Sequence, residues 1–241
     1  MKLVNSFYEI LSWDSKFFGY TVARILDVIP FIKMNQILTN MRSENVKLAY
    51  WFIKSTTIAN RVAEQNNGVL VDEKITFIKD LSDKDIVVRN MHINSYKKRR
   101  IDKKLLSLVI DSGKYSRFRK DRRFTHNEFK RLYTEWIQKS ILRKKAFDVL
   151  IYSDVEESMK GFITLEKKEH TGIIGLIAVN NKYRGKGVGK ALVRGALSRF
   201  QLMKLTKAEV VTQKRNISAV QFYLKLGFGI LRVQNVYHFW L

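Results

Sequence analysis

The chain has 241 residues, of which 46% are apolar, and its 45 basic residues exceed its 22 acidic ones by a formal net charge of +23. It has no cysteine, which excludes disulfides, thiolate metal sites and a cysteine nucleophile, and its four scattered histidines lack metal-ligand spacing, so we expect no metal. No apolar run reaches the roughly 20 residues of a membrane span, and the first residues lack the apolar core of a signal peptide, so we expect a cytoplasmic protein without membrane insertion.

Residues 1–90 are predicted to alternate short strands and helices. The only proline, Pro30, lies just before the first predicted helix, where proline is tolerated. β-Branched and aromatic residues favour strands, and apolar residues at helical spacing favour helices. The strands are predicted over 7–11, 21–26, 46–53 and 69–80, and the helices over 32–42 and 58–66. We interpret this part as an N-terminal α/β domain.

Positive charge is concentrated in residues 91–123, a basic connection that contains a short helix predicted over 103–110. Three interpretations of this charge are open: a nucleic-acid partner, anionic small-molecule substrates, or a solvated lysine-rich surface. No zinc-finger, homeodomain or RRM pattern accompanies it.

The remainder of the chain predicts a second run of strands and helices. A long helix is expected from Thr125, which forms a capping-box pattern with Glu128, and its apolar stripe is expected to pack on a sheet. Another helix is expected to end at Gly227. In chain order the elements are strands over 147–153, 159–166 and 171–179, a glycine-rich turn and helix, a strand over 208–212, a helix over 217–226 and a strand over 230–240. The first two of these strands are predicted to form a hairpin across 154–158.

The glycine-rich turn carries glycine at three alternate positions, residues 185, 187 and 189. Missing side chains let a ligand approach the backbone, so the N–H groups that open the following helix can bind an anion. A Walker loop would need glycine in place of Arg184 and a hydroxyl in place of Ala191, and a dinucleotide fingerprint would need glycine in place of Lys190. The turn therefore predicts a phosphate site of another kind.

Two motifs resemble one family. Arg184, Gly187 and Gly189 form the pattern Arg-x-x-Gly-x-Gly, which resembles the pyrophosphate loop of the GNAT superfamily, the GCN5-related N-acyltransferases that bind acyl-coenzyme A. Residues 216–228 read Asn-x-x-Ala-x-x-Phe-Tyr-x-x-x-Gly-Phe and resemble a helix of the same superfamily. The resemblance implies an α/β (α+β) GNAT fold with a mixed, mostly antiparallel sheet and a splayed central strand pair. It also implies a catalytic domain over 91–241 and a partial GNAT-like domain over 1–90.

The resemblance also implies a site. Acyl-CoA, as acetyl-CoA or a short hydroxyacyl-CoA, is the expected cofactor, with no metal, and Tyr223 is the implied catalytic residue because the family's tyrosine reaches the sulfur. Asn216, seven residues before it, shares its helix face. The implied cofactor contacts are Ile177, Ala178, Val179, Arg184, Gly185, Lys186, Gly187, Val188, Gly189, Lys190 and Asn216.

The expected chemistry is aminolysis of a thioester. With tyrosine near pKa 10 and a thiol near 8.5, full proton transfer from Tyr223 is uphill by roughly 2 kcal/mol, so we expect it to act as a hydrogen-bond donor. The base stays unassigned among Asp14, Glu166, His170 and relayed water.

Two further segments, residues 11–25 and 113–124, resemble TDP-fucosamine acetyltransferase and related nucleotide-amino-sugar N-acyltransferases. This implies acyl transfer to the amine of a dTDP-linked 3- or 4-amino-dideoxyhexose, a role in surface polysaccharide such as lipopolysaccharide O-antigen, and a homodimer. Interleaved aromatics and guanidiniums suit a base and a diphosphate, and neighbouring aromatics suit the floor under a deoxysugar. The expected substrate contacts are Phe17, Phe18, Tyr20, Tyr115, Arg117, Phe118 and Arg119.

Other interpretations of these residues stay open. Phe17 and Phe18 could be ordinary core residues, and Arg117 and Arg119 could be solvated. The acceptor could instead be a protein or peptide amine. A nucleic-acid-binding protein on a degenerate GNAT scaffold is a third alternative, but the intact motifs argue against it, so we do not expect a nucleic-acid partner.

Overall fold

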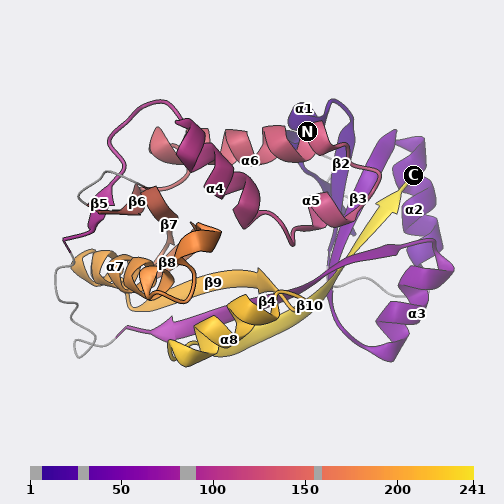
Figure 1. The fold of residues 1–241 in the computed structure, drawn as a ribbon. Helices are drawn as coiled ribbons and strands as arrows, with labels where there is room; N and C mark the ends of the chain where they lie inside the picture. The colour runs from indigo at the N-terminus through magenta and orange to yellow at the C-terminus, as the bar shows by residue number, and fades with distance from the viewer. Residues whose placement is uncertain (1–6, 27–32, 82–90, 155–158) are drawn as a thin grey trace. The chain divides into compact units, whose positions relative to one another are not determined.

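The structure is a computed structural model that describes residues 7–26, 33–81, 91–154 and 159–241, and its contacts divide the chain into two units (Figure 1). Unit 1 consists of Met1–Ile75, Gln213–Arg215 and Arg232–Leu241, and unit 2 of Thr76–Thr212 and Asn216–Leu231. Strands β4 (Val69–Asp80) and β10 (Gly229–Trp240) contribute residues to both units. The expected domain boundary at residues 90/91 adjoins residues 82–90, which lie outside the described ranges, and the division into domains 1–90 and 91–241 stays a prediction.

Unit 1 is a sheet in the order β1-β2-β3-β10-β4. Strand β2 runs parallel to β3, whereas β1 is antiparallel to β2 and β10 is antiparallel to β3. Its elements are β1 (Tyr8–Ile10), α1 (Ser12–Phe18), β2 (Thr21–Ile25), α2 (Met34–Ser43), β3 (Val46–Lys54) and α3 (Thr57–Gln65), with parts of β4 and β10. The sheet residues Trp51, Tyr237 and Phe239 form a buried core with apolar side chains of α2 and α3. Since alternate strand residues point to opposite faces, these helices cover one face of the sheet.

Unit 2 contains strands in the order β4-β9-β8-β7-β6-β5. Strands β5, β6, β7 and β8 pair antiparallel in turn, whereas β8 pairs parallel with β9. Its strands are β5 (Ile93–Ser95), β6 (Asp148–Ser153), β7 (Met159–Lys168), β8 (Thr171–Val179) and β9 (Lys207–Gln213), and its helices are α4 (Lys103–Ser112), α5 (Arg117–Lys120), α6 (His126–Ile141), the 3₁₀ turn η3 (Asn181–Tyr183), α7 (Val188–Leu202) and α8 (Ile217–Lys225).

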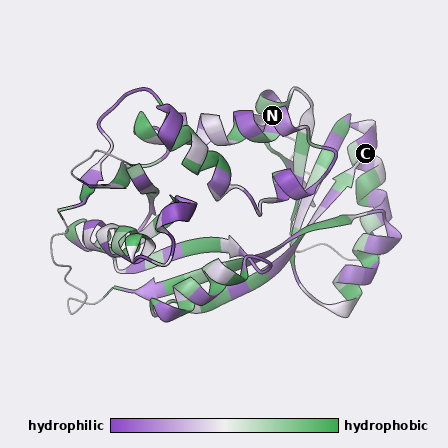
Figure 2. Cartoon of the chain, viewed as in Figure 1, coloured by the Kyte–Doolittle hydropathy of each residue, from purple (hydrophilic) through white to green (hydrophobic). Residues whose placement is uncertain are grey.

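Helices cover the strands of unit 2. Helix α7 packs on β6, β7 and β8, and α4 and α6 lie on the other side of these strands (Figure 1). The approach of α7 is close, since a Cβ at Gly172 would lie 2.3 Å from the ring of Phe200. Hydrophilic and hydrophobic bands occur along the helices and along the strands (Figure 2). Such bands are typical of elements that bury one face and expose the other.

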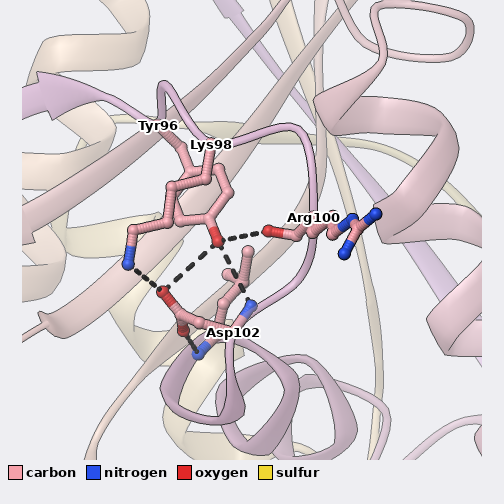
Figure 3. A network of polar contacts seen from close by, with 5 residues as sticks. Tyr96, Lys98, Arg100 and Asp102 are labelled. Atoms are coloured by element: carbon pink, nitrogen blue, oxygen red, sulfur yellow. Dashed lines mark hydrogen bonds and ion pairs between the residues drawn. The ribbon is translucent and has the colours of Figure 1, made fainter.

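A polar network orders the basic connection (Figure 3). Asp102 caps α4 by accepting a hydrogen bond from the Leu105 N–H at 2.8 Å, and Lys98 Nζ lies 3.2 Å from the same carboxylate. The Tyr96 hydroxyl donates to the Arg100 carbonyl at 2.8 Å and accepts from the Asp102 N–H at 3.2 Å. Burial opposes ionisation of Asp102, but these donors outweigh it and hold the pKa of the carboxyl below its usual value.

Most expected elements are confirmed. Strands β4 and β8 have the expected bounds, β6 and β7 pair as expected, and Thr125 and Glu128 form the capping box of α6. Pro30, residue 32 of the helix expected over 32–42 and the hairpin residues 155–158 lie outside the described ranges.

Three short elements, α1, β5 and α5, were not expected. Helix α1 begins after Leu11, which provides no side-chain cap, so no sequence signal marks its start. Strand β5 has three residues and exists because it pairs with β6. Helix α5 has four residues and lies in the basic connection. Elements of this length depend on tertiary contacts more than on propensity.

The described ranges lack both membrane-spanning helices and clusters of metal-ligating side chains. No helix in them combines the length and the apolar character needed to cross a bilayer. No group of three or more histidine, cysteine, aspartate or glutamate side chains in them could hold a metal ion.

Candidate functional site

Strands β8 and β9 separate along their length. Their parallel pairing covers Thr171–Ile174 and Lys207–Val210, whereas β8 continues to Val179 and β9 to Gln213. A β-bulge lies where the separation begins, because the register between β7 and β8 shifts between Ile163 and Leu165. The result is an opening beside residues 175–179 of β8.

Backbone groups of β8 face this opening. Opposed residues of an antiparallel pair alternate between hydrogen-bonded and non-hydrogen-bonded pairs. The Asn180 N–H donates to the Lys160 carbonyl at 2.8 Å, so Ala178 is the next residue bonded to β7 in the same register. The amides of Ile177 and Val179 therefore point away from β7, toward the opening. Both residues are among the cofactor contacts that the sequence resemblance implies.

The glycine-rich turn leads directly into α7. Gly185 and Gly187 adopt left-handed φ values of 75° and 82°, and nothing lies within 4 Å of a Cβ built on either. Gly187 is the N-cap of α7, and its carbonyl accepts the hydrogen bond of the Ala191 N–H at 2.9 Å. The N–H groups of residues 187–190 therefore precede the helical ladder and are available to an anion.

Helix α7 begins close to both β8 and α8. A Cβ at Gly189 would lie 3.3 Å from the ring of Phe222 in α8 and 3.6 Å from Val179 in β8. Lys186 adds positive charge beside the turn, with its Nζ 5.8 Å from the centre of the Tyr183 ring. The turn, the end of β8 and helix α8 thus converge at one place in unit 2.

Arg184 has a different position from the other residues of its motif. Its Nε donates to the Val179 carbonyl at 3.0 Å, and its terminal nitrogen pairs with the carboxylate of Asp111 at the end of α4. The guanidinium therefore joins the end of β8 to α4. At the turn itself, the groups available to a ligand are the backbone amides of residues 187–190.

Asn216 lies at the start of α8, and Tyr223 lies in its last turn. Asn216 is the N-cap and accepts from the Ala219 N–H at 3.4 Å. Tyr223 is buried, with its ring 5.6 Å from that of Phe77 in β4 and 5.7 Å from that of Phe228. Burial raises the pKa of the Tyr223 phenol above its ordinary value, which favours the protonated, donating form.

The expected acceptor contacts of unit 2 lie on and beside α5. Phe118 is buried, with its ring 5.3 Å from that of Phe124 and the Arg117 guanidinium 4.4 Å from its centre. The Arg119 guanidinium lies 5.3 Å from the ring of Phe129. Tyr115 is partly buried. The alternating aromatic and cationic residues therefore stack on neighbouring rings of the same unit.

The expected contacts of unit 1 form an aromatic row with two tryptophans. Phe17 stacks on Trp13 at 5.3 Å between ring centres, and Phe18 stacks on Tyr20 at 5.7 Å. Phe17 and Phe18 meet edge to face at 5.0 Å, and Tyr20 lies 5.8 Å from Trp240. The row is partly exposed, with 39% of Trp13 accessible to solvent.

The structure adds two residues that sequence reasoning missed. The Thr164 hydroxyl accepts a hydrogen bond from the Leu176 N–H at 2.7 Å and so fills the bulge. Gly175 was an available signal, because glycine inside a strand often marks a bulge, and a Cβ there would lie 2.6 Å from Thr164 Oγ1. Asp111, the partner of Arg184, carried no signal because 73 residues separate the two.

The fold of this chain has counterparts among known proteins. Residues 115–228 match the model of the Acetyltransferase (GNAT) family. A GCN5-related N-acetyltransferase structure from Sphaerobacter thermophilus superposes with a TM-score of 0.63 over 97% of this chain and 76% of the other, at 13% identity. This chain has a GNAT fold. The structural likeness shows the fold, and the family match covers just under half of the chain.

Two curated relatives match parts of this chain. The spore coat polysaccharide biosynthesis protein SpsD of Bacillus subtilis is 21% identical over 136 residues, which are 56% of this chain and 46% of SpsD. The N-alpha-acetyltransferase 30 of Saccharomyces cerevisiae is 31% identical over 70 residues, which are 29% of this chain and 39% of that protein. The chain thus spans less than half of the length of either relative.

Proposed function

We propose that this protein is an acyl-CoA-dependent N-acyltransferase whose acceptor is the amine of a nucleotide-linked sugar. The observation that carries the proposal is the open start of α7, with its left-handed Gly187, beside the parted end of β8. Amides of residues 187–190 suit a diphosphate, and the amides of Ile177 and Val179 suit a thioester carbonyl. Both sets belong to one unit.

The proposed reaction is aminolysis. The amine nitrogen forms a bond to the acyl carbon, the carbon–sulfur bond breaks, the nitrogen loses a proton to water or to a base, and the sulfur gains one. The role assigned to Tyr223 is donation of a hydrogen bond to the departing sulfur, which suits its raised pKa. Glu166 is a poor candidate for the base because its carboxylate pairs with Lys145 at 3.1 Å.

The sugar acceptor is supported by the likeness to SpsD, a protein named for polysaccharide biosynthesis, and by the aromatic and cationic residues described above. We further propose acetyl-CoA or a short hydroxyacyl-CoA as the donor, a dTDP-linked 3- or 4-amino-dideoxyhexose as the acceptor, surface polysaccharide as the product, and a cytoplasmic homodimer as the working form. These specifics rest on the sequence resemblance.

A second candidate acceptor is a protein or peptide amine. It is favoured by the 31% identity over 70 residues to a protein named N-alpha-acetyltransferase 30. The two candidates share the donor site and differ in the acceptor alone.

One assay separates these acceptors. The full chain is incubated with a panel of acyl-CoAs and either dTDP-amino sugars or short peptides with free N-termini, and release of free thiol is followed. Turnover with an amino sugar and not with peptides is the expected result. Turnover with peptides alone would replace the sugar acceptor with the second candidate. If neither class of acceptor causes release of free thiol, the acyl-transfer proposal is overturned.

A further inference from the structure

Unit 1 contains a pocket with a volume of about 280 Å³. Residues of four strands line it. The residues that matter here are Arg24 from β2, Phe52 from β3, Lys74 from β4, and Arg232 and Gln234 from β10. All five belong to unit 1.

The pocket lies on the face of the sheet that α2 and α3 leave uncovered. Trp51, which precedes Phe52, points into the core beneath these helices, so Phe52 points to the opposite face. In the strand registers Arg24 is paired with Tyr50, and Phe52 with Val236. By alternation, the side chains of Arg24, Gln234 and Arg232 share the face of Phe52.

The lining is strongly basic. It contributes three cationic side chains and, within the part of the chain that the structure describes, no carboxylate. Lys74 Nζ lies 5.4 Å from the centre of the Phe52 ring, which holds this cation over an aromatic face. Arg24 pairs with Glu9 at 2.8 Å, and both side chains are about half exposed, so this ion pair is readily exchanged for a stronger anion.

We propose that this pocket binds the diphosphate group of a nucleotide. Three cationic side chains from three strands, β2, β4 and β10, line this one pocket, and a multiply charged anion suits such a lining. Arginine forks and a glutamine amide match phosphate oxygens, which accept several hydrogen bonds. A volume of about 280 Å³ lies at the lower end of small-molecule sites and suits a diphosphate with part of its nucleoside. A nucleic-acid duplex is too wide for it.

The pocket is distinct in sequence from the glycine-rich turn, to which the proposed function assigns the diphosphate of acyl-CoA. The naming of the ligand as a nucleotide rests on that proposed function, because a nucleotide-linked acceptor carries a diphosphate of its own. This proposal assigns that diphosphate to the pocket in place of Arg117 and Arg119, which stack on Phe118 and Phe129. The diphosphate chemistry rests on the pocket alone.

The test measures binding of TDP, inorganic pyrophosphate and CoA to the full chain by isothermal titration calorimetry, each alone and with a saturating amount of the others. We expect TDP and CoA to bind at the same time, and pyrophosphate to compete with TDP. In the double variant Lys74→Gln/Arg232→Gln we expect TDP binding to weaken at least tenfold and CoA binding to change less than twofold.

The matched control is Lys130→Gln/Arg199→Gln, which removes the same charge from exposed helix positions of unit 2. An equal loss of TDP binding in this control would overturn the proposal in favour of general attraction to a basic protein. Competition between TDP and CoA in the wild type would also overturn it, since both would then occupy the turn. Failure of CoA to bind while TDP binding depends on Lys74 and Arg232 would overturn the proposed function and leave this pocket supported. Melting temperatures show whether both double variants are folded. If Lys74→Gln/Arg232→Gln does not fold, the single variant Arg232→Gln and the competition experiments on the wild type test the proposal instead.

Discussion

At the scale of the residue, the conformation of Gly187 decides what the turn can present. Its φ of 82° is in the left-handed region, which a β-branched residue avoids, although there is empty space around the position. The requirement is therefore one of backbone conformation and not of room. Lys186, its neighbour, contributes an exposed charge.

These two residues should respond differently to substitution. Gly187→Val strains the backbone by about 1–3 kcal/mol or more and forces the turn out of shape, so we expect acyl-CoA binding to weaken more than tenfold. Lys186→Ala removes one surface charge and should weaken binding about two- to fivefold. Calorimetric dissociation constants check this, with near-UV circular dichroism as the test of folding. Similar constants for both variants would contradict a backbone-dominated site.

Tyr223 offers a conservative test of catalysis. Tyr223→Phe keeps the ring contacts with Phe77 and Phe228 and removes the hydroxyl alone. We expect kcat to fall about 100-fold, because one hydrogen-bond donor to the leaving group is lost, with little change in the dissociation constant of acyl-CoA. Unchanged turnover would exclude the role of donor. Since burial raises the tyrosine pKa, the wild-type rate should not decline up to pH 10 through ionisation of this group.

At the scale of the element, Asp102 fixes the start of α4, the helix whose last turn holds Asp111 against Arg184. The carboxylate caps the helix, pairs with Lys98 and meets the Tyr96 hydroxyl (Figure 3). Asp102 thus orders this part of the basic connection.

We expect Asp102→Ala to lower the free energy of unfolding by about 1 kcal/mol through loss of the cap, and Asp102→Asn, an equally good cap that does not titrate, to retain most of it. The folded pKa of Asp102 is depressed, so its charge-dependent stabilisation is present above the unfolded value near 3.9 and is lost as pH falls through the folded value. The free energy of unfolding of the wild type should therefore exceed that of Asp102→Ala by less at pH 3 than at pH 6. The difference in this free energy between Asp102→Asn and Asp102→Ala should stay constant. Urea titrations at both pH values measure this, and a wild-type difference that does not change with pH would refute it.

At the scale of the whole molecule, the net charge of +23 favours any polyanion. A surface without a groove-reading element should bind duplex DNA through counterion release alone, and such binding weakens by about 10³–10⁵ between 50 and 200 mM salt. We expect DNA retention to vanish over this range while acyl-CoA binding persists, because the backbone amides of residues 187–190 are not displaced by salt. Filter binding measures DNA retention, and calorimetry at the same ionic strength measures acyl-CoA binding. Persistent DNA binding with no acyl-CoA affinity would favour the nucleic-acid alternative.

Local order was readable from the chain. Strands β4 and β8, the capping box at Thr125 and the helix end at Gly227 are fixed by neighbours within a few residues, and pattern arguments found them. The turn from Arg184 to Lys190 was found for the same reason, since alternate glycines before a helix have few other uses. Helix α1 was missed because no side chain caps its start.

Long-range partners were decided by the tertiary structure. The bond from Leu176 to Thr164, the pairing of Arg184 with Asp111, and the gathering of Arg24, Lys74 and Arg232 in one pocket join residues that are 12 to more than 150 positions apart. Nothing local fixes such pairs, because strand order and register bring them together. The sequence by itself determined most of the strands and helices and the glycine-rich turn at the start of α7, because these depend on near neighbours in the chain. The tertiary structure decided where β8 leaves β9 and which charges face one another, since both follow from how strands pair.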